Sequence, residues 1–501
     1  MAGELGSARR HAATALSALT IDRRARPGIA GQLAEGIRAL IRDGRLAAGA
    51  RLPASRDLAA EHGIGRSTVV AVYEQLVAEG LLAARVGRGT QVSPEAPRLL
   101  AAAPRAEAGP ARVSDPAIRA RPFAITGMAD DLLPGSDWVR AVRQSAPAAL
   151  VHLGRDRGFG LPALRQAIAE HVASLKGLSV AADQIVVTSG HAESVLLIAR
   201  AAFAPGSAVY VEDPGYAVTW RTLALAEVRP VLRTVDADGL AAPAAAGDGD
   251  TVAGAILTPS RQFPLGTVMP IGRRLAWTEW ARRMPCRWLV EDDFDSELRY
   301  RGGAPTALAA LLPDQVIYEA SFSKLIGRGL RLGFLVVPPR LRDVVAAIQP
   351  TIGFGASLAA QAPLARFLES GAWPRHLRRL RRVLRHRFEI ALRRLAILEV
   401  AGLVAVGQQD GGMHVALTLT DARLVRRGDR AVAAALRRVD VEAQALSTYC
   451  AGPNPVQGLV LGFAGWPEAR LEEAFDRFGE TLRTLATRRT VGAADSATRR
   501  S

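Results

Sequence analysis

Short apolar segments alternate with helical segments beyond residue 185, and this alternation constrains the fold more than any other feature. The predicted strands are residues 185–188, 208–212, 252–258, 287–291, 315–319 and 332–337. Strands that alternate with helices form a mostly parallel sheet, because each parallel connection crosses back over one of its faces. We therefore expect an α/β domain with helices on both faces. From about residue 360 the pattern becomes helical and then mixed, which predicts a small C-terminal α+β subdomain.

A segment rich in Pro, Ala and Arg, residues 94–121, interrupts the chain before this domain. It has no sustained hydrophobic period, which is typical of a semi-extended linker. We predict a DNA-binding domain over 14–93, the linker over 94–121, the α/β domain over 122–485 and a disordered tail over 486–501.

The region before the linker is predicted to be helical. Apolar residues at helical spacing indicate a helix over Gln32–Arg42. A second helix is expected from Ser55, as its N-cap, to His62. Ser67 is expected to cap a third helix, with Val70, Tyr73, Leu76 and Val77 along it. Two short strands around a Gly-Arg-Gly turn follow, so the order predicts a winged helix-turn-helix domain.

In such a domain the third helix enters the major groove of double-stranded DNA with its N-terminal residues toward the bases. Residues 23–92 hold 11 Arg and 6 acidic residues, a net charge of +5 that favours phosphate contacts. The alternative from spacing alone is a small helical domain that binds protein. The predicted DNA contacts are Arg66, Ser67 and Thr68 on the third helix, Arg85 and Arg88 on the wing, and Arg56 on the second helix.

The chain has 64 Lys and Arg residues, yet only Lys176 and Lys324 are lysines. The net charge of +16 fits either a nucleic-acid partner or a general Arg-rich composition. Arg cannot act as an amine nucleophile, whereas Lys can, so the two lysines are candidates for amine chemistry. Lys176 has no supporting context, and we predict that it is a surface residue.

Lys324 follows a predicted strand, at the sheet edge where ligands bind in open α/β folds. Ser321, Ser323 and Arg331 surround it, which are residues suited to binding a phosphate group. Asp292 follows another strand, where a carboxylate can pair with the ring nitrogen of pyridoxal phosphate. These residues predict covalent amine chemistry with a phosphorylated cofactor.

Gly190 ends a strand and opens a helix, so the backbone N–H groups of Gly190, His191 and Ala192 are expected to face a phosphate. Tyr216, after another strand, is either a ring that stacks on the cofactor or a core residue. Asp293 and Asp295 are interpreted as loop residues that cap or solvate. We expect no metal site.

Residues 51–92, RLPASRDLAAEHGIGRSTVVAVYEQLVAEGLLAARVGRGTQV, resemble the DNA-binding domain of GntR-type bacterial regulators nearly end to end. The segments TSGHAES, VEDPGY, LTPSRQFPLG, VEDDFDSELRY and SFSKLIGRGLRLG resemble the fold type I aminotransferase domain of the MocR-type branch of that family. With GGMHVAL and GLVLGFAG, the resemblance covers about residues 14–485.

This resemblance implies pyridoxal 5′-phosphate as cofactor, with Lys324 as the internal-aldimine lysine and Asp292 as the partner of the pyridine nitrogen. It implies that Arg331, Ser321 and the helix start at Gly190 hold the phosphate. It also implies a domain-swapped homodimer that binds an operator with two half-sites, direct or inverted. The cofactor-binding set is Gly190, His191, Ala192, Tyr216, Asp292, Phe294, Ser321, Ser323, Lys324 and Arg331.

The chain departs from the family pattern at several positions. Phe294 stands where the family usually has Tyr, whose hydroxyl bonds the phenolic oxygen of the cofactor. Arg261 and Arg328 replace His and Pro, and they either grip an anionic effector or form salt bridges. His191 replaces a small residue and is either a satisfied residue at the helix start or a ligand contact. Leu461 stands where working aminotransferases commonly carry Arg.

We therefore predict a pyridoxal-phosphate-dependent transcriptional regulator that senses an amino compound or the cofactor itself. The alternative is an active aminotransferase with an accessory DNA-binding domain, and the lack of a donor at Phe294 argues against it. Hydrophobic residues make up 49% of the chain, which excludes disorder of the whole chain. With two cysteines, no signal-peptide pattern and no apolar run long enough to span a bilayer, we expect a cytoplasmic protein.

Residues 375–387 hold seven Arg and two His, with a stripe of leucines at helical spacing. We interpret this segment as an amphipathic helix whose basic face meets solvent or another subunit. Contact with DNA or the linker is the alternative.

Overall fold

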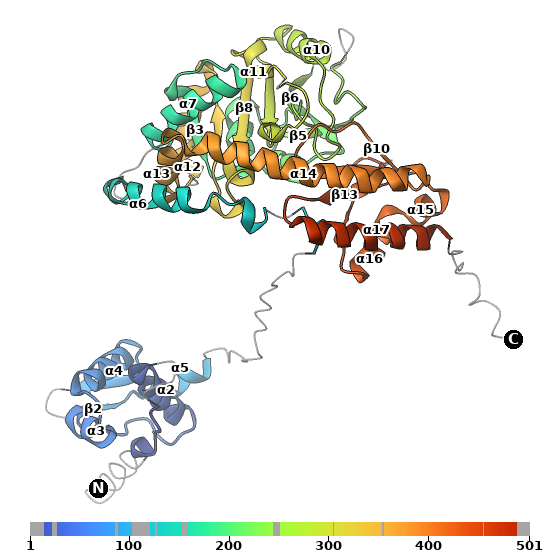
Figure 1. Ribbon diagram of the computed structural model, residues 1–501. Coiled ribbons are helices and arrows are strands. Elements are labelled where there is room, and N and C mark those ends of the chain that lie inside the picture. The colour runs from blue at the N-terminus through green and yellow to red at the C-terminus, as the bar shows by residue number, and fades with distance from the viewer. Residues whose placement is uncertain are drawn as a thin grey trace, which may run out of the picture. The chain divides into compact units, whose positions relative to one another are not determined.

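The computed structural model describes residues 15–22, 28–85, 89–102, 121–125, 128–152, 158–243, 251–303, 305–352, 355–453 and 455–487 (Figure 1). The chain divides into two compact units, residues 1–116 and 117–501, which are described separately. Arg88, residues 103–120 of the predicted linker and residues 488–501 of the predicted tail lie outside the described residues.

The first unit has the predicted order of a winged helix-turn-helix. Its elements are α2 (Ile29–Arg42), α3 (Ser55–His62), α4 (Arg66–Ala78), β1 (Leu82–Arg85), β2 (Gly89–Val92) and α5 (Ala96–Ala102). The two strands pair antiparallel as a short wing. Leu33, Ile37, Leu58 and Leu76 are fully buried in one core that ties the three main helices together. Gly63 adopts φ 60° at the end of α3, a left-handed conformation that glycine tolerates and that turns the chain toward α4.

Four details of this unit differ from the sequence predictions. The N-cap of α3 is Ala54 rather than Ser55, and the N-cap of α4 is Gly65 rather than Ser67, with no side-chain cap on either helix. Val69 and Val72 of α4 are buried, whereas Val77 is 36% exposed, because the core-facing stripe is rotated from the predicted one. Residues 96–102 form α5, and Ala96 packs into the core although it was assigned to the linker.

The second unit is built around a seven-stranded sheet with the order β3-β9-β8-β7-β6-β4-β5. All neighbouring strands are parallel except β9, which runs antiparallel to β3 and β8. The strands are β3 (Ile185–Thr188), β4 (Ala208–Asp213), β5 (Arg229–Thr234), β6 (Val252–Leu257), β7 (Trp288–Asp293), β8 (Val316–Ser321) and β9 (Gly333–Val336). The predicted mostly parallel sheet is confirmed, and β5 is a strand that the sequence analysis missed.

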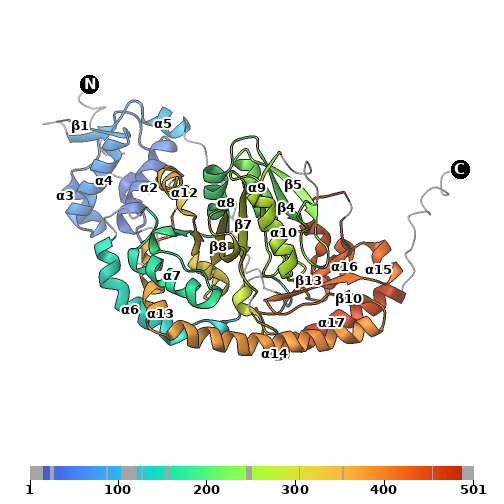
Figure 2. The ribbon, with the colours of Figure 1, turned by 90° about the horizontal axis from the view of Figure 1, so that it is seen from above.

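Helices cover both faces of this sheet (Figures 1 and 2). Helices α8 (His191–Ala202), α9 (Ala217–Leu225) and α12 (Pro339–Ile352) pack on one face. Helices α7 (Pro162–Lys176), α10 (Ile271–Arg282), α11 (Leu308–Leu311) and α13 (Leu358–Glu369) pack on the other. Helix α6 (Gly135–His152) packs against α13. Because successive side chains of a strand point to opposite faces, each strand contributes to both cores.

The C-terminal part forms the predicted smaller α+β subdomain. An antiparallel sheet of order β10-β11-β13-β12 is covered by helices that include the C-terminal α17. The elements are β10 (Val404–Val406), β11 (His414–Leu419), α15 (Ala422–Arg427), α16 (Asp429–Arg438), β12 (Gln444–Ala445), β13 (Gly458–Gly462) and α17 (Glu468–Thr487).

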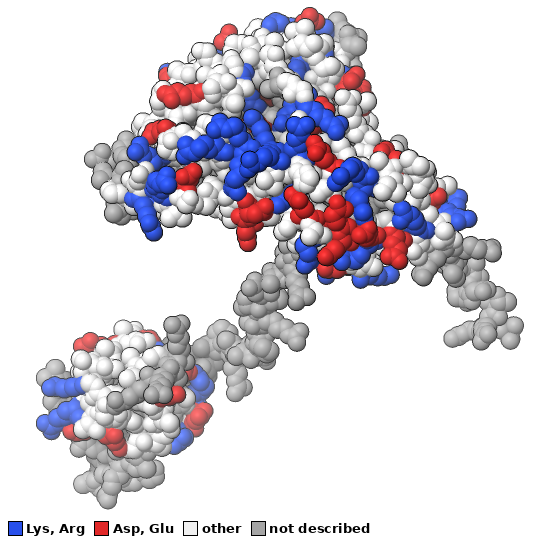
Figure 3. Space-filling view, in the orientation of Figure 1, with Lys and Arg blue, Asp and Glu red and all other residues white. Residues whose placement is uncertain are grey.

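Helix α14 (Ala372–Val400) is 29 residues long and contacts α13 in its first part and α17 and β10 in its later part. Leu377, Leu380, Leu384 and Phe388 form its buried stripe, as predicted. Figure 3 shows basic side chains gathered over this region of the surface. Several of its arginines already have partners, since Arg379 donates to the carbonyl of Leu132 and Arg387 pairs with Asp131.

Candidate functional site

A cavity of about 480 Å³ opens at the carboxyl ends of β7 and β8, where the small sheet meets the large one. It brings together nearly all the residues that the sequence predicted for cofactor binding. Gly190, His191, Tyr216, Asp292, Phe294, Ser321, Ser323, Lys324 and Arg331 all line it. Ala192 is exposed in the first turn of α8 and is not a lining residue.

Lys324 lies in the single turn Phe322–Lys324 that follows β8, so the strand places its amine inside the cavity. Its Nζ lies 4.0 Å from the ring centroid of Phe294 and 5.6 Å from that of Phe263. Burial lowers the pKa of Lys324, and the positive charges of Arg261 and Arg328 act in the same direction against Asp295 and Asp292. A lowered pKa leaves more of the amine unprotonated, which is the form that attacks a carbonyl carbon.

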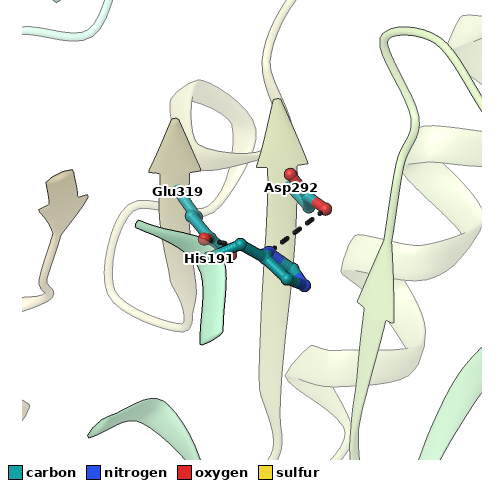
Figure 4. Close-up of side chains that lie close together, drawn as sticks. All are labelled: His191, Asp292 and Glu319. Carbon is teal, nitrogen blue, oxygen red and sulfur yellow. Dashed lines mark hydrogen bonds and ion pairs between the residues drawn. The ribbon is translucent and has the colours of Figure 1, made fainter. Parts of the chain in front are cut away.

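Asp292 lies near the end of β7 and faces the same side of the sheet as α8. His191 Nδ1 is 3.6 Å from Asp292 Oδ2 and 3.0 Å from Glu319 Oε1 of β8 (Figure 4). Burial raises the pKa of Asp292 to about 7, with His191 opposing the shift and Glu319 adding to it. Burial would lower the pKa of His191, but Glu319 and Asp292 raise it to about 9.

Glu319 was not among the residues predicted from the sequence. Its only sequence signal is that a carboxylate interrupts the apolar strand VIYEAS, and the structure shows that this side chain is 2% exposed. The side-chain nitrogen of His191 and the carboxylate oxygens of Asp292 and Glu319 lie within 4.8 Å of one another.

Groups suited to binding an anion gather at the start of α8. Gly190 has φ 114° and ψ −174°, which only glycine adopts without strain, and it turns the chain from β3 into the helix. The first-turn N–H groups of a helix lack acceptors within the helix and carry partial positive charge. The hydroxyls of Ser321 and Ser323 and the exposed guanidinium of Arg331 line the same cavity. These donors fit a phosphate group.

The aromatic residues give the cavity its apolar wall. Tyr216 is 41% exposed, with its ring centroid 5.3 Å from that of His191 and 5.5 Å from that of Phe263. It is therefore a cavity residue rather than the core residue that was the alternative. Phe294 packs at 4.0 Å from the Lys324 amine and offers no hydrogen-bond donor to a ligand.

The two unusual arginines differ. Arg261 is buried, pairs with Asp295 at 3.0 Å and donates to the carbonyl of His414 at 2.8 Å, so it belongs to a salt bridge. Arg328 is exposed at the cavity and has no ion pair among the described residues. The interpretation of Asp295 as a solvating loop residue was wrong, because Arg261 requires a buried partner.

The prediction that Lys176 lies on the surface was also wrong. Its side chain is 7% exposed, and Nζ lies 2.8 Å from Oδ2 of Asp293, which is itself buried rather than in a solvated loop. The hydroxyl of Tyr318 donates to the same carboxylate at 2.7 Å. Lys176 therefore pairs with Asp293, whereas Lys324 lines the cavity that also holds the neighbouring Asp292.

Leu461 is buried in the main core, although its neighbours Gly462 and Ala464 line the cavity. A residue at position 461 points away from the cavity. The absence of Arg there consequently says less about substrate binding than the sequence suggested.

The predicted DNA contacts lie on the first unit. Arg66 and Ser67 are exposed and Thr68 is half-buried in the first turn of α4. The side chain of Arg56 is 80% exposed and its Nε lies 3.2 Å from Asp57. Arg85 ends β1 at the wing, and Arg88 lies outside the described residues.

Residues 29–92 match the family model described as bacterial regulatory proteins of the gntR family, and residues 139–478 match that for class I and II aminotransferases. The chain is 33% identical to the HTH-type pyridoxine biosynthesis transcriptional regulator PdxR of Corynebacterium glutamicum, over 88% of this chain and 93% of that protein. It is 32% identical to the probable rhizopine catabolism regulatory protein MocR of Rhizobium meliloti, over 91% and 94%.

The chain is a MocR-type regulator of the GntR family. As in the MocR-type architecture, a DNA-binding domain precedes an aminotransferase domain whose cofactor is pyridoxal 5′-phosphate. The residues fit that group, because the cavity offers an amine, a carboxylate and a cluster of anion donors. At position 294, however, the phenylalanine supplies no hydrogen-bond donor to the cofactor.

Solved structures support the fold of the aminotransferase domain. An archaeal alanine:glyoxylate aminotransferase aligns with a TM-score of 0.65 at 20% identity, covering 73% of this chain and 91% of that one. LysN, the alpha-aminoadipate aminotransferase of Thermus thermophilus, aligns with a TM-score of 0.63 at 23% identity, covering 72% and 92%. Within the described residues, no helix of this MocR-type chain is both long and apolar enough to cross a bilayer.

Proposed function

We propose that this protein is a cytoplasmic transcriptional regulator that binds pyridoxal 5′-phosphate through Lys324 and senses an amino compound or the cofactor itself. The observation that carries the proposal is the position of the Lys324 amine. It lies in an aromatic, desolvated cavity that also holds Asp292, in a chain that carries a winged helix-turn-helix.

Each residue of the cavity has a role in this proposal. The cofactor supplies an aldehyde that bonds reversibly to amines. Lys324 presents the amine, Asp292 accepts a hydrogen bond from the ring nitrogen, and Tyr216 covers one face of the ring. Ser321, Ser323, Arg331 and the N–H groups of α8 hold the phosphate, while Phe263 and Phe294 keep water from the Lys324 amine.

Sensing follows from competition between amines. With the cofactor bound, an effector that carries an amino group would compete with the Lys324 amine for the aldehyde, and Lys324 would be released. The effector shifts the protein between two states only if its affinity for them differs. We propose that the two states present the winged helices differently to the two half-sites of the operator, within a domain-swapped homodimer.

An active aminotransferase with an accessory DNA-binding domain is the second candidate. The cavity holds the amine and the carboxylate that such chemistry requires. Phe294 weighs against efficient turnover, because nothing at that position donates to the phenolic oxygen.

One experiment separates the two functions. The protein loaded with cofactor is mixed with a panel of amino acids and amines while visible absorbance, keto-acid release and affinity for its own upstream DNA are measured. A regulator changes its DNA affinity with at least one compound and releases little keto acid. Sustained keto-acid release with unchanged DNA affinity would favour the enzyme.

The DNA half of the proposal has its own test. Arg66→Ala should weaken operator binding by about 1–3 kcal/mol, since it removes a cation at the start of the recognition helix. Cofactor content should not change. Arg42→Ala, on α2 and paired with Glu35, is a matched control in a gel-shift titration. Wild-type affinity in the Arg66 variant would remove that residue from the interface.

A further inference from the structure

Two buried carboxylates face each other on adjacent strands of the cavity floor. Asp292 of β7 and Glu319 of β8 are direct partners in the parallel register, and they are 7% and 2% exposed. They follow Val290 and Ile317, which pack on the face covered by α8, so both carboxylates point to that face. Like charges directly opposite on neighbouring strands repel each other, and burial strengthens the repulsion.

His191 of α8 lies between these carboxylates (Figure 4). Its Nδ1 is 3.0 Å from Glu319 Oε1 and 3.6 Å from Asp292 Oδ2. Its Nε2 lies 2.8 Å from the hydroxyl of Thr219 in α9. An ionised carboxylate only accepts hydrogen bonds, so Nδ1 carries a hydrogen, while the threonine fixes the ring from its other side.

We propose that His191, oriented by Glu319 and Thr219, is a positioning residue that keeps Asp292 ionised and available to the ring nitrogen of the cofactor. The inference deepens the proposed function, because it rests on cofactor binding in this cavity. It assigns His191 to the floor of the site and leaves the phosphate to the residues around Ser321 and Arg331.

The charges around His191 support this role. Glu319 faces it from β8, Asp292 from β7 and Lys324 from the turn after β8, while Thr219 and Tyr216 face it from α9 and the residue before it. Two of these groups are anionic and one is an amine with a lowered pKa. One imidazolium therefore offsets one of two carboxylate charges.

Removal of His191 would leave Asp292 beside an uncompensated buried carboxylate. Burial and Glu319 raise the pKa of Asp292 to about 7 even though His191 opposes them, and His191 is the strongest opposing group. Without it, Asp292 would hold a proton at neutral pH and lose its charge toward the ring nitrogen. Lys324 opposes the shift of Asp292 more weakly than His191 does, and Glu319 Oε2 has no hydrogen-bond partner among the described residues.

The test is a double-mutant cycle of His191→Ala and Glu319→Leu in the full chain. Affinity for pyridoxal 5′-phosphate is measured by visible absorbance from pH 6 to 10, and unfolding of the cofactor-free protein is followed separately. The control His386→Ala removes an exposed histidine of α14 that pairs with Glu468.

His191→Ala should bind the cofactor at least about tenfold more weakly at pH 7, which corresponds to one pH unit in the ionisation of Asp292. Its affinity should recover as pH rises. The double variant, which lacks both the imidazole and the repelling carboxylate, should return to within about threefold of wild type, because the two effects are coupled. A purely structural role for His191 predicts additive losses without recovery at high pH.

Wild-type affinity and pH profile in His191→Ala would overturn the inference, as would a double variant weaker than both single ones. If His191→Ala does not fold, His191→Gln retains a neutral donor and should show the same rise of affinity with pH. Failure of the wild-type protein to bind the cofactor would instead overturn the proposed function.

Discussion

Two neighbouring aspartates of strand β7 each have one of the two lysines in their surroundings, yet the two lysines have opposite character. On one face Lys176 lies 2.8 Å from Asp293 and both side chains are nearly inaccessible. On the other face Lys324 lies in the cavity with Asp292, under the rings of Phe263 and Phe294, and has no salt bridge among the described residues.

The pKa shifts follow this difference. Burial favours the neutral form of Lys176, but Asp293, Glu297 and Glu291 outweigh it and raise its pKa. Burial also dominates at Lys324, and there Arg261 and Arg328 help it to lower the pKa. The same residue type is therefore a fixed cation on one face and a reactive amine on the other. The groups around each lysine determine its role, and the sequence positions of the two aspartates do not.

The sharpest contrast concerns covalent binding. Lys324→Ala should abolish the visible absorbance of the bound cofactor, and Lys324→Arg should do the same, because a guanidinium does not condense with the aldehyde. Lys176→Arg should keep the absorbance. Borohydride reduction followed by peptide mass analysis locates the modified lysine. A cofactor found on Lys176, or an unchanged spectrum in Lys324→Ala, would contradict the assignment of Lys324 as the reactive amine.

The second contrast concerns stability. Lys176→Met should cost about 3–5 kcal/mol of unfolding free energy, because it leaves Asp293 buried without its cation. A denaturant titration monitored by far-UV circular dichroism measures the loss. Lys176→Met combined with Asp293→Asn should recover part of it. A variant as stable as wild type would show that Lys176 is not a structural cation.

The same pair has a defined pH dependence. The pKa of Asp293 is lowered, since Lys176 outweighs the effect of burial, so its contribution to stability is present above the ordinary value of 3.8 and is lost as pH falls. The pKa of Lys176 is raised, so its contribution is present below 10.5 and is lost as pH rises through the folded value. Lys176→Met should flatten both limbs of the unfolding profile.

A third test compares the reactivity of the two amines. In the cofactor-free protein, competitive acetylation at increasing pH should reach its midpoint for Lys324 below that of a free lysine. Lys176, whose side chain is 7% exposed, should remain largely unmodified. Mass spectrometry of the two lysine peptides gives both profiles from one sample. Acetylation of Lys176 in the folded protein, or a midpoint for Lys324 at or above that of a free lysine, would contradict the comparison.

The smallest expected effect is that of Phe294→Tyr, which adds a donor next to the Lys324 amine. A hydrogen bond to a charged oxygen is worth about 1.5–3 kcal/mol, so the pH midpoint of the visible band should fall by roughly one to two units. Keto-acid release should rise. Phe263→Tyr, which adds a hydroxyl to the other aromatic ring near Lys324, is the control. No change in either variant would show that position 294 does not limit the chemistry.

The sequence predicted the fold where local patterns decide it. The buried strands appear in the sequence as short apolar segments. For this reason the predicted positions of six of the seven strands of the large sheet agree with the structure within a few residues. Strand β5 was not predicted because it lies at the edge of the sheet. Its sequence contains Arg229, Pro230 and Arg233 in place of the continuous apolar residues of the buried strands.

The cavity residues followed from strand-end positions and from the family resemblance. Errors occurred where burial depends on partners distant in sequence. Lys176 ends a helix 117 residues before Asp293, and nothing local signals that the two meet. Glu319 was not predicted because its role depends on the strand register, which places it opposite Asp292.

Helix α14 links the two halves of the aminotransferase domain as a single rod. Its 29 residues include no glycine, and its one proline, Pro374, lies in the first turn, so the helix has no built-in kink. At 1.5 Å per residue it is roughly 43 Å long, and a tilt of about 5° at one end moves the other by roughly 4 Å. In mechanical terms, a small rotation of the C-terminal sheet would be magnified along this helix as along a lever arm.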